Sequence, residues 1–249
     1  MDALNYAKEI KEQITAWRRD LHRIPELGLD LPQTKKYVCE KLDRWGVPYT
    51  EYDDCSGVVA LLGKPGKKVL ALRADMDALP IKEETGFEYS STNDNMHACG
   101  HDCHTAILLG VAKILKEHED ELNGQVKLFF QPGEEGPGGA PVMIADGCME
   151  NPRVDSIYAL HVGEIPEGAK AGDITLHYGD ITAADDQFDL YVIGKGGHGA
   201  APHMCVDPVV VATTIINTFQ TIVSREMDPT EPCVITVATL QAGRGAENI

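Results

Sequence analysis

The chain has 249 residues, of which 43% are hydrophobic and 24% are charged, a composition that excludes a disordered or fibrous protein. Its 22 basic against 39 acidic residues give a formal net charge of −17, which disfavours nucleic acid and anionic membranes as partners. No apolar run approaches the roughly 20 residues of a membrane span. The seven scattered cysteines and the lack of a signal-peptide pattern lead us to expect a reduced, cytoplasmic protein.

The first hundred residues predict two helices followed by two strands. Apolar residues spaced by three and four positions predict one helix over Leu4–Leu21 and a second over Pro32–Trp45, which a glycine follows. The β-rich runs Gly57–Leu62 and Lys68–Arg73 are joined by the turn signal GKPGKK. The polar stretch Lys82–Asn95 has no regular pattern, so we assign no element there.

Helices and strands alternate in the middle of the chain. The patterns predict a buried helix over Thr105–Leu115, a strand over Val126–Phe130, a short helix over Pro141–Asp146 and a strand over Ser156–Leu160. Such alternation favours an α/β sheet covered by helices on both faces.

The pattern changes after about Gly179. A strand over Gln187–Ile193, a glycine-rich turn, a helix over Pro208–Arg225 and a strand over Val234–Leu240 suit half of a small α+β domain. The chain ends at GRGAENI, directly after a predicted strand, so we expect it to be cut within a fold.

The segment MHACGHDCH concentrates groups that bind metals. Imidazole and thiolate are ligands that zinc and neighbouring metals prefer, and side chains two apart on an extended segment project to the same side. Cys99 and His101 can therefore hold one metal site together. His104, one helical turn further, can be a ligand, a substrate contact or a packed histidine. The metal-type and acidic groups of the segment are His97, Cys99, His101, Asp102, Cys103 and His104.

Three further signals lie where predicted strands end, the place where open α/β sheets carry their sites. Glu134 and Glu135 follow one strand, and in such a pair one carboxylate can bind a metal while the other takes a proton from metal-bound water. Asp77, in the run RADMD, can orient a histidine ligand by accepting its other N–H. His161 follows the strand over Ser156–Leu160, and we interpret it as a further ligand.

The glycine-rich segment GKGGHG has neither the residues nor the helix context of a phosphate-binding loop. His198 on this turn can stabilise an oxyanion, although the segment can also be only a turn. A different interpretation of the metal-type residues is a binding module with a closed structural zinc. That zinc would be held by Cys99, His101, Cys103 and His104.

Six motifs in order make the chain similar to one family: LRADMDALP, MHACGHDCHTA, FFQPGEEG, YALHV, GKGGHGAAPH and GRGAENI. Together they resemble the metal-dependent amidohydrolases of the aminoacylase and glutamate-carboxypeptidase superfamily. The branch is that of hippurate hydrolase and the plant indole-acetyl-amino-acid hydrolases, which the segment RRDLHRIPELGL also fits.

The resemblance implies an α/β catalytic domain, with a mixed sheet and helices on both faces, into which an α+β lid and dimerisation domain is inserted. Residues 1–179 would be the first part of the catalytic domain, and residues 180–249 the first half of the lid. Family members run well beyond 249 residues, so we expect the lid to be incomplete and one late histidine ligand to be missing.

The resemblance also implies the roles of individual residues. Two divalent ions, commonly zinc, manganese, cobalt or nickel, would be bridged by Cys99, with Glu134 as general base and Asp77 supporting the ligands. His198 would reach an active site, often that of the partner in a lid-paired homodimer, and Asn248 would help hold the substrate. The implied metal ligands are Cys99, His101, Glu135 and His161.

The implied reaction is hydrolysis of the amide bond of a small N-acyl amino acid to a carboxylic acid and a free amino acid. Two alternatives stay open at this point. One is a dipeptidase or aminopeptidase of the same superfamily that acts on a free N-terminus. The other is a truncated, inactive homologue that acts only as a binding module.

Overall fold

The computed structural model describes residues 2–66, 68–136, 138–163, 168, 170–176, 178–179, 184–243 and 248–249. The chain forms two compact units, Met1–Ala169 and Lys170–Ile249. Among the described residues, no helix combines the length and the apolar character needed to cross a membrane.

The helical start of the first unit differs from the prediction in one respect. The predicted helix Leu4–Leu21 is two helices, α1 (Ala3–Glu9) and α2 (Lys11–His22), which meet at Ile10. The backbone leaves the helical conformation there (φ −95°, ψ 8°), and the Ile10 side chain is buried although no residue of α1 is. The apolar spacing continues across the break, so periodicity alone does not reveal it.

Helix α3 (Pro32–Trp45) has the predicted bounds. Proline occupies its first turn, where a missing N–H is tolerated, and Gly46 ends it with a left-handed φ of +64°. Helix α4 (His101–Glu117) begins four residues before the predicted Thr105, so the metal-type residues of MHACGHDCH overlap its first turn.

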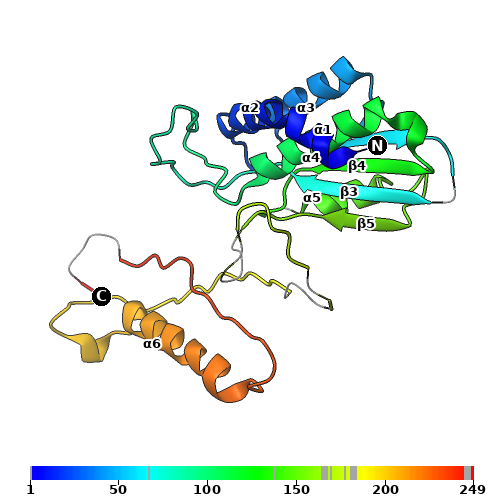
Figure 1. The fold of residues 1–249 in the computed structure, drawn as a ribbon. Coiled ribbons are helices and arrows are strands. Elements are labelled where there is room, and N and C mark those ends of the chain that lie inside the picture. The colour runs from blue at the N-terminus through cyan, green and yellow to red at the C-terminus, as the bar shows by residue number, and fades with distance from the viewer. Residues whose placement is uncertain are drawn as a thin grey trace. The chain divides into compact units, whose positions relative to one another are not determined.

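A mixed five-stranded sheet organises the first unit, with the order β1-β2-β4-β3-β5 (Figure 1). Strand β4 pairs antiparallel with β2 and parallel with β3, and β5 extends the sheet parallel to β3. The turn signal between β2 and β3 therefore makes no hairpin, because β4 lies between these two strands. The strands are β1 (Tyr49–Glu51), β2 (Val58–Gly63), β3 (Val69–Asp75), β4 (Gln125–Gln131) and β5 (Ser156–Ala159).

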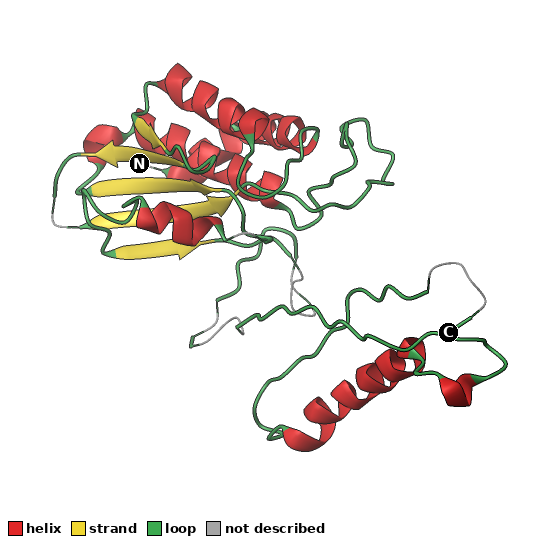
Figure 2. Ribbon diagram, turned by 180° about the vertical axis from the view of Figure 1, so that it is seen from behind, coloured by secondary structure: helices red, strands yellow, loops and turns green. Residues whose placement is uncertain are grey.

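Both faces of the sheet are covered, as the sequence predicts. Leu128 and Phe130 of β4 join a core cluster with residues of α2, α3 and α4, while Phe129 points to the other face, since side chains alternate along a strand. There Phe129 packs in a second cluster with Met143 of α5 (Gly139–Ala145). Figure 2 shows a short helix lying over the strands on this face. The parallel strands β3, β4 and β5 end at one edge of the sheet, which brings together the motifs that follow them.

The second unit contains helix α6 (Pro208–Thr221), which Asp207 caps and a π-helical turn over Ile222–Glu226 extends, confirming the predicted helix. The predicted strands over 187–193 and 234–240 are wrong. Both stretches lack strand partners within the described part of this unit, where the one bridge joins Lys195 to Val206. Alternating side chains alone do not make a strand, because each strand needs a hydrogen-bonded neighbour.

Candidate metal centre

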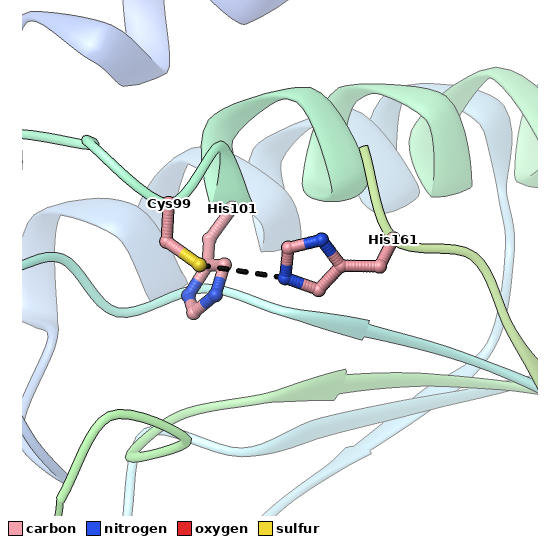
Figure 3. A group of neighbouring side chains, drawn as sticks. All are labelled: Cys99, His101 and His161. Carbon is pink, nitrogen blue, oxygen red and sulfur yellow. Dashed lines mark hydrogen bonds between the residues drawn. The ribbon is translucent and has the colours of Figure 1, made fainter. Parts of the chain in front are cut away.

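Three ligand-type side chains meet at the edge of the sheet where β3, β4 and β5 end (Figure 3). Cys99 lies in the loop before α4, His101 is the first residue of that helix, and His161 follows β5 by two residues. The Sγ of Cys99 is 3.4 Å from the Nε2 of His161. One ligand atom from each of the three residues lies within 4.8 Å of the other two, so these three predicted ligands come together in the structure.

His101 presents one free ring nitrogen to this cluster. Its side chain is fully buried, and its Nδ1 donates a hydrogen bond of 2.8 Å to the backbone oxygen of Asp77. Its Nε2 lies 3.7 Å from the Oε1 of Glu135 and 3.9 Å from the Oε2 of Glu134, so the two glutamates and His101 form a second ligand-type group. Among the described residues, neither this Nε2 nor the Glu135 Oε1 has a hydrogen-bond partner.

His161 is oriented in the same way. Its Nδ1 donates to the backbone oxygen of Val162 at 2.5 Å, which leaves the Nε2 lone pair on the side of Cys99. In both histidines a backbone carbonyl fixes the tautomer and turns Nε2 toward the cluster, the arrangement that metal-binding histidines use.

The two glutamates are held by Asp77 through their backbone. The carboxylate of Asp77 accepts hydrogen bonds from the amides of Glu134 (3.0 Å) and Glu135 (2.9 Å). Burial would raise the pKa of Asp77, but these bonds and the proximity of His101 hold it below its ordinary value. Asp77 therefore does more than the sequence predicts, because it supports His101 mainly through its carbonyl and holds the glutamate turn with its carboxylate.

A glycine makes this turn compact. A Cβ on Gly139 would lie 1.8 Å from the backbone oxygen of Pro132, and the Gly139 amide donates to the Gly133 oxygen at 3.0 Å. A side chain at position 139 would push the turn, with Glu134 and Glu135, away from the sheet. The glycine-rich sequence after the glutamates is thus a packing requirement at this position.

The electrostatics of the cluster suit a cation. Burial, with the hydrogen bond and negative charge of Glu135, raises the pKa of the Cys99 thiol to about 12. Two buried polar atoms, His101 Nε2 and Glu135 Oε1, have no hydrogen-bond partner in the part of the chain that the structure describes, which is rare in a folded core. A divalent ion would satisfy both atoms and compensate the neighbouring carboxylates, and sulfur, imidazole and carboxylate are a donor set that zinc and related metals accept. The residues fit such an ion.

His104 is not available as a ligand. Its Nδ1 is 2.5 Å from the Oδ1 of Asp75, and its Nε2 accepts the backbone N–H of Val162 at 2.8 Å. Cys103 belongs to none of the ligand-type groups found among the described residues. A closed structural zinc built on Cys103 and His104 is therefore not supported by the structure.

Comparison with known proteins agrees with this geometry. The model of peptidase family M20/M25/M40 matches residues 71–241. The chain belongs to this family. This M20 chain is 42% identical over 238 residues to an N-acyl-L-amino acid amidohydrolase of Geobacillus stearothermophilus, covering 94% of the chain and 63% of that relative. It is 44% identical over 233 residues to the IAA-amino acid hydrolase ILR1-like 5 of Arabidopsis thaliana, covering 93% and 52%.

Solved structures are similar as well. A putative aminohydrolase of methicillin-resistant Staphylococcus aureus gives a TM-score of 0.73 at 36% identity, over 93% of the M20 chain and 61% of that chain. A Bacillus subtilis protein described as a dinuclear metal-binding peptidase from the M20 family gives 0.58 at 36% identity, over 62% and 44%. The M20 chain thus spans between about half and two thirds of the length of the two relatives compared above.

A buried polar network behind the metal cluster is absent from the sequence predictions. Asp102 Oδ2 accepts from His22 Nδ1 at 2.8 Å and lies 2.7 Å from Arg18 Nε, and His22 Nε2 donates to Glu83 at 3.3 Å. Because both ring nitrogens of His22 face carboxylates, the hydrogen bond with Asp102 raises its pKa despite burial. The i, i+4 spacing of Arg18 and His22 is the signal in the sequence, since it places two polar residues on one side of a helix.

The second unit of the M20 chain brings two predicted site residues together. The Oδ1 of Asn248 accepts the amide of Gly199 at 3.0 Å, and the amide of Ala200 donates to the Nδ1 of His198 at 3.0 Å. The neutral ring of His198 then carries its proton on Nε2. Its exposed side chain thus offers a donor, as the predicted oxyanion role requires.

Proposed function

We propose that the whole protein is a metal-dependent amidohydrolase that cleaves the amide bond of N-acyl amino acids. The observation that carries this is the convergence of Cys99, His101, Glu135 and His161, two of which present buried atoms that lack protein partners in the described structure. The names of similar proteins, an N-acyl-L-amino acid amidohydrolase and an IAA-amino acid hydrolase, support the substrate class.

In this proposal Cys99, His101, Glu135 and His161 would hold two divalent ions. Bound divalent ions supply Lewis acidity, which lowers the pKa of water and polarises a carbonyl oxygen. The histidines donate their Nδ1 protons to backbone carbonyls, so each can offer its Nε2 lone pair. The thiol of Cys99 must lose its proton on binding, because the thiolate is the ligand.

Glu134 is the proposed general base. It is the more exposed of the two adjacent glutamates, with 40% of its side chain accessible against 23% for Glu135, so it can meet water and substrate while Glu135 binds metal. Asp77 fixes the backbone of both and so keeps their separate directions. Glu134 would take the proton of the attacking water and return it to the leaving nitrogen.

His198 and Asn248 are proposed to act from the lid. The Nε2–H of His198 would donate a hydrogen bond to the oxyanion formed from the amide carbonyl, and Asn248 would hold the turn of His198 and contact the substrate. We further propose that residues 1–179 are the catalytic part and 180–249 the lid part, and that the lid pairs two copies of the protein into a homodimer.

Zinc or manganese is the proposed metal and the cytoplasm the proposed location. The mixture of one thiolate, imidazoles and a carboxylate supports zinc or a neighbouring transition metal over magnesium or calcium, which prefer oxygen ligands. All seven cysteines are free thiols, which supports a reducing compartment.

The test compares metal content and hydrolysis in matched variants. Metal bound per chain is measured by elemental analysis after dialysis against trace zinc or manganese, and hydrolysis is measured with N-acetyl and N-benzoyl amino acids and with an unblocked dipeptide. We expect Glu134→Gln to keep its metal and lose hydrolysis, Cys99→Ala to lose metal, and the exposed control Glu84→Gln to change neither. Undiminished metal in Cys99→Ala, or preference for the unblocked dipeptide, would contradict the proposal.

A further inference from the structure

A chain of hydrogen bonds runs beneath the metal cluster and joins the ends of three strands. Arg73 donates from Nε to the side-chain oxygen of Gln131 (2.8 Å) and from Nη1 to Asp75 Oδ2 (2.7 Å). The other oxygen of Asp75 faces the Nδ1 of His104, whose Nε2 accepts the amide of Val162. Gln131 ends β4, Asp75 ends β3, and Val162 follows β5.

The proton positions along this row of hydrogen bonds are fixed by the groups at its two ends, the Val162 amide and the Arg73 guanidinium. The backbone amide of Val162 can only donate, so the Nε2 of His104 must be the acceptor and the proton must sit on Nδ1. At the other end the guanidinium of Arg73 can only donate, so Asp75 is ionised and accepts on both oxygens. All the donors therefore point in a consistent direction, and the 97% buried His104 has one tautomer.

The Val162 end of this row of hydrogen bonds sets the position of His161. Val162 is the next residue, and its carbonyl receives the Nδ1 proton of His161 while its amide is held by His104. The ring of His104 also packs edge-on against the ring of His161, at 4.6 Å between centroids. A Cβ on Gly100 would lie 2.5 Å from Val162 Cγ2, so the Val162 side chain fits against bare backbone at the start of α4.

His161 needs such support because the strand before it, β5, is exposed and holds the following residues only weakly in place. All four residues of β5 are exposed, and β5 pairs with β3 on one side at the end of the sheet order. The His161 side chain is itself exposed, unlike the fully buried His101. What directs its Nε2 toward Cys99 is the Val162 peptide, and the buried anchor of that peptide is His104.

We infer that His104 is a positioning residue for the reaction: held by Asp75 and Arg73, it fixes the Val162 peptide and thereby aims His161 at the metal. The inference rests on the metal-binding role proposed for His161. It assigns a task to the Arg73–Asp75 pair of the LRADMDALP motif and to the last histidine of MHACGHDCH.

The first test uses Co²⁺ affinity, measured by competition with a chromogenic chelator. His104→Phe keeps a ring against His161 but removes both hydrogen bonds, and we expect it to weaken Co²⁺ binding by about 10–100-fold, as loss of a partner that orients a ligand does. His104→Gln offers an oxygen to the Val162 amide and should recover part of that loss. The matched control is His118→Phe, at the other end of α4.

The second test needs no metal, and its first part uses only the wild-type chain. In the metal-free chain with ¹⁵N-labelled histidine and valine, NMR should show the His104 proton on Nδ1 and slow exchange of the Val162 amide. The amide should exchange faster in His104→Phe than in His104→Gln.

The outcomes separate the two proposals. Unchanged Co²⁺ affinity in His104→Phe, a proton on the Nε2 of His104, or an unprotected Val162 amide would each overturn the positioning role and leave the proposed function intact. Unchanged affinity in His161→Ala would instead overturn the ligand assignment in the proposed function, and with it the positioning role. Loss of affinity in His104→Phe with partial rescue by His104→Gln, together with the expected NMR pattern, supports both.

Discussion

Replacing Asp77 by asparagine should loosen the turn that carries both glutamates. The side chain is fully buried, and its two oxygens receive the amides of Glu134 and Glu135. Asparagine has nearly the same shape but one oxygen, so its NH₂ group would face one of these N–H donors. One charge-assisted hydrogen bond is lost and one backbone donor is left buried without a partner.

The size of the effect follows from these two losses. A hydrogen bond to a charged group contributes about 1.5–3 kcal/mol and a buried unpaired donor costs about 1–3 kcal/mol; since the two overlap, we expect Asp77→Asn to lower the free energy of unfolding by about 2–4 kcal/mol. With a urea m-value of about 2 kcal/mol/M, the midpoint should fall by about 1–2 M. The unfolding is measured in EDTA, so that bound metal adds nothing to the stability of either protein.

The control is Asp54→Asn, an exposed aspartate in the same unit, which should stay within about 0.5 kcal/mol of wild type. Metal affinity of Asp77→Asn should fall as well, because Glu135 moves with its backbone. An Asp77→Asn midpoint equal to that of wild type would refute the reasoning that this carboxylate holds the turn.

Three other predictions concern neighbouring residues. Zinc binding at pH 7 should release about one proton from the Cys99 thiol of the wild-type chain, measured in weak buffer, because the pKa of this thiol is raised to about 12 and the ligand is the thiolate. Zinc binding without proton release would contradict thiolate ligation. Gly100→Ala should destabilise more than Gly86→Ala, because both have positive φ (+94° and +70°) but only the Cβ at 100 meets Val162, and equal urea midpoints would show that this contact gives way freely. Glu83 should stabilise the fold fully above about pH 4.5 and progressively less toward pH 2, because hydrogen bonds from Ser91, Thr85 and His22 outweigh burial and lower its pKa from 4.5 to about 2. The urea midpoints of wild type and Glu83→Gln should therefore converge as the pH falls. A gap between the midpoints that stays constant with pH would show that the charge of Glu83 is not what stabilises the fold.

The sequence was sufficient to place the candidate ligands at one edge of a sheet. The motifs RADMD, QPGEE and HV each follow a predicted strand, and the structure ends β3, β4 and β5 at these motifs. The strand patterns are local, so periodicity detects them. Glycine and proline at the ends of α3 are equally local, which is why its bounds agree.

Long-range partners could not be predicted in this way. No periodicity tells which ring nitrogen of His104 accepts, or that Val162 supplies the donor, because these residues are 58 positions apart. The break at Ile10 has no proline or glycine beside it in the sequence, so no local signal marks it. The expected strands of the second unit failed for the related reason that alternation describes one segment, whereas a strand is defined by its neighbour.

The place of β4 in the sheet has a consequence for the order of folding. β2 and β3 follow each other in the chain, yet neither can reach its final sheet position until β4, some 50 residues later, enters between them. Such non-local pairing requires a long loop to close first and is slow compared with local structure. Glu134 and Glu135 arrive with β4, so the acidic half of the cluster forms only when the centre of the sheet closes. Metal uptake during refolding would then report the entry of β4 into the sheet, and it would occur later than the formation of the helices.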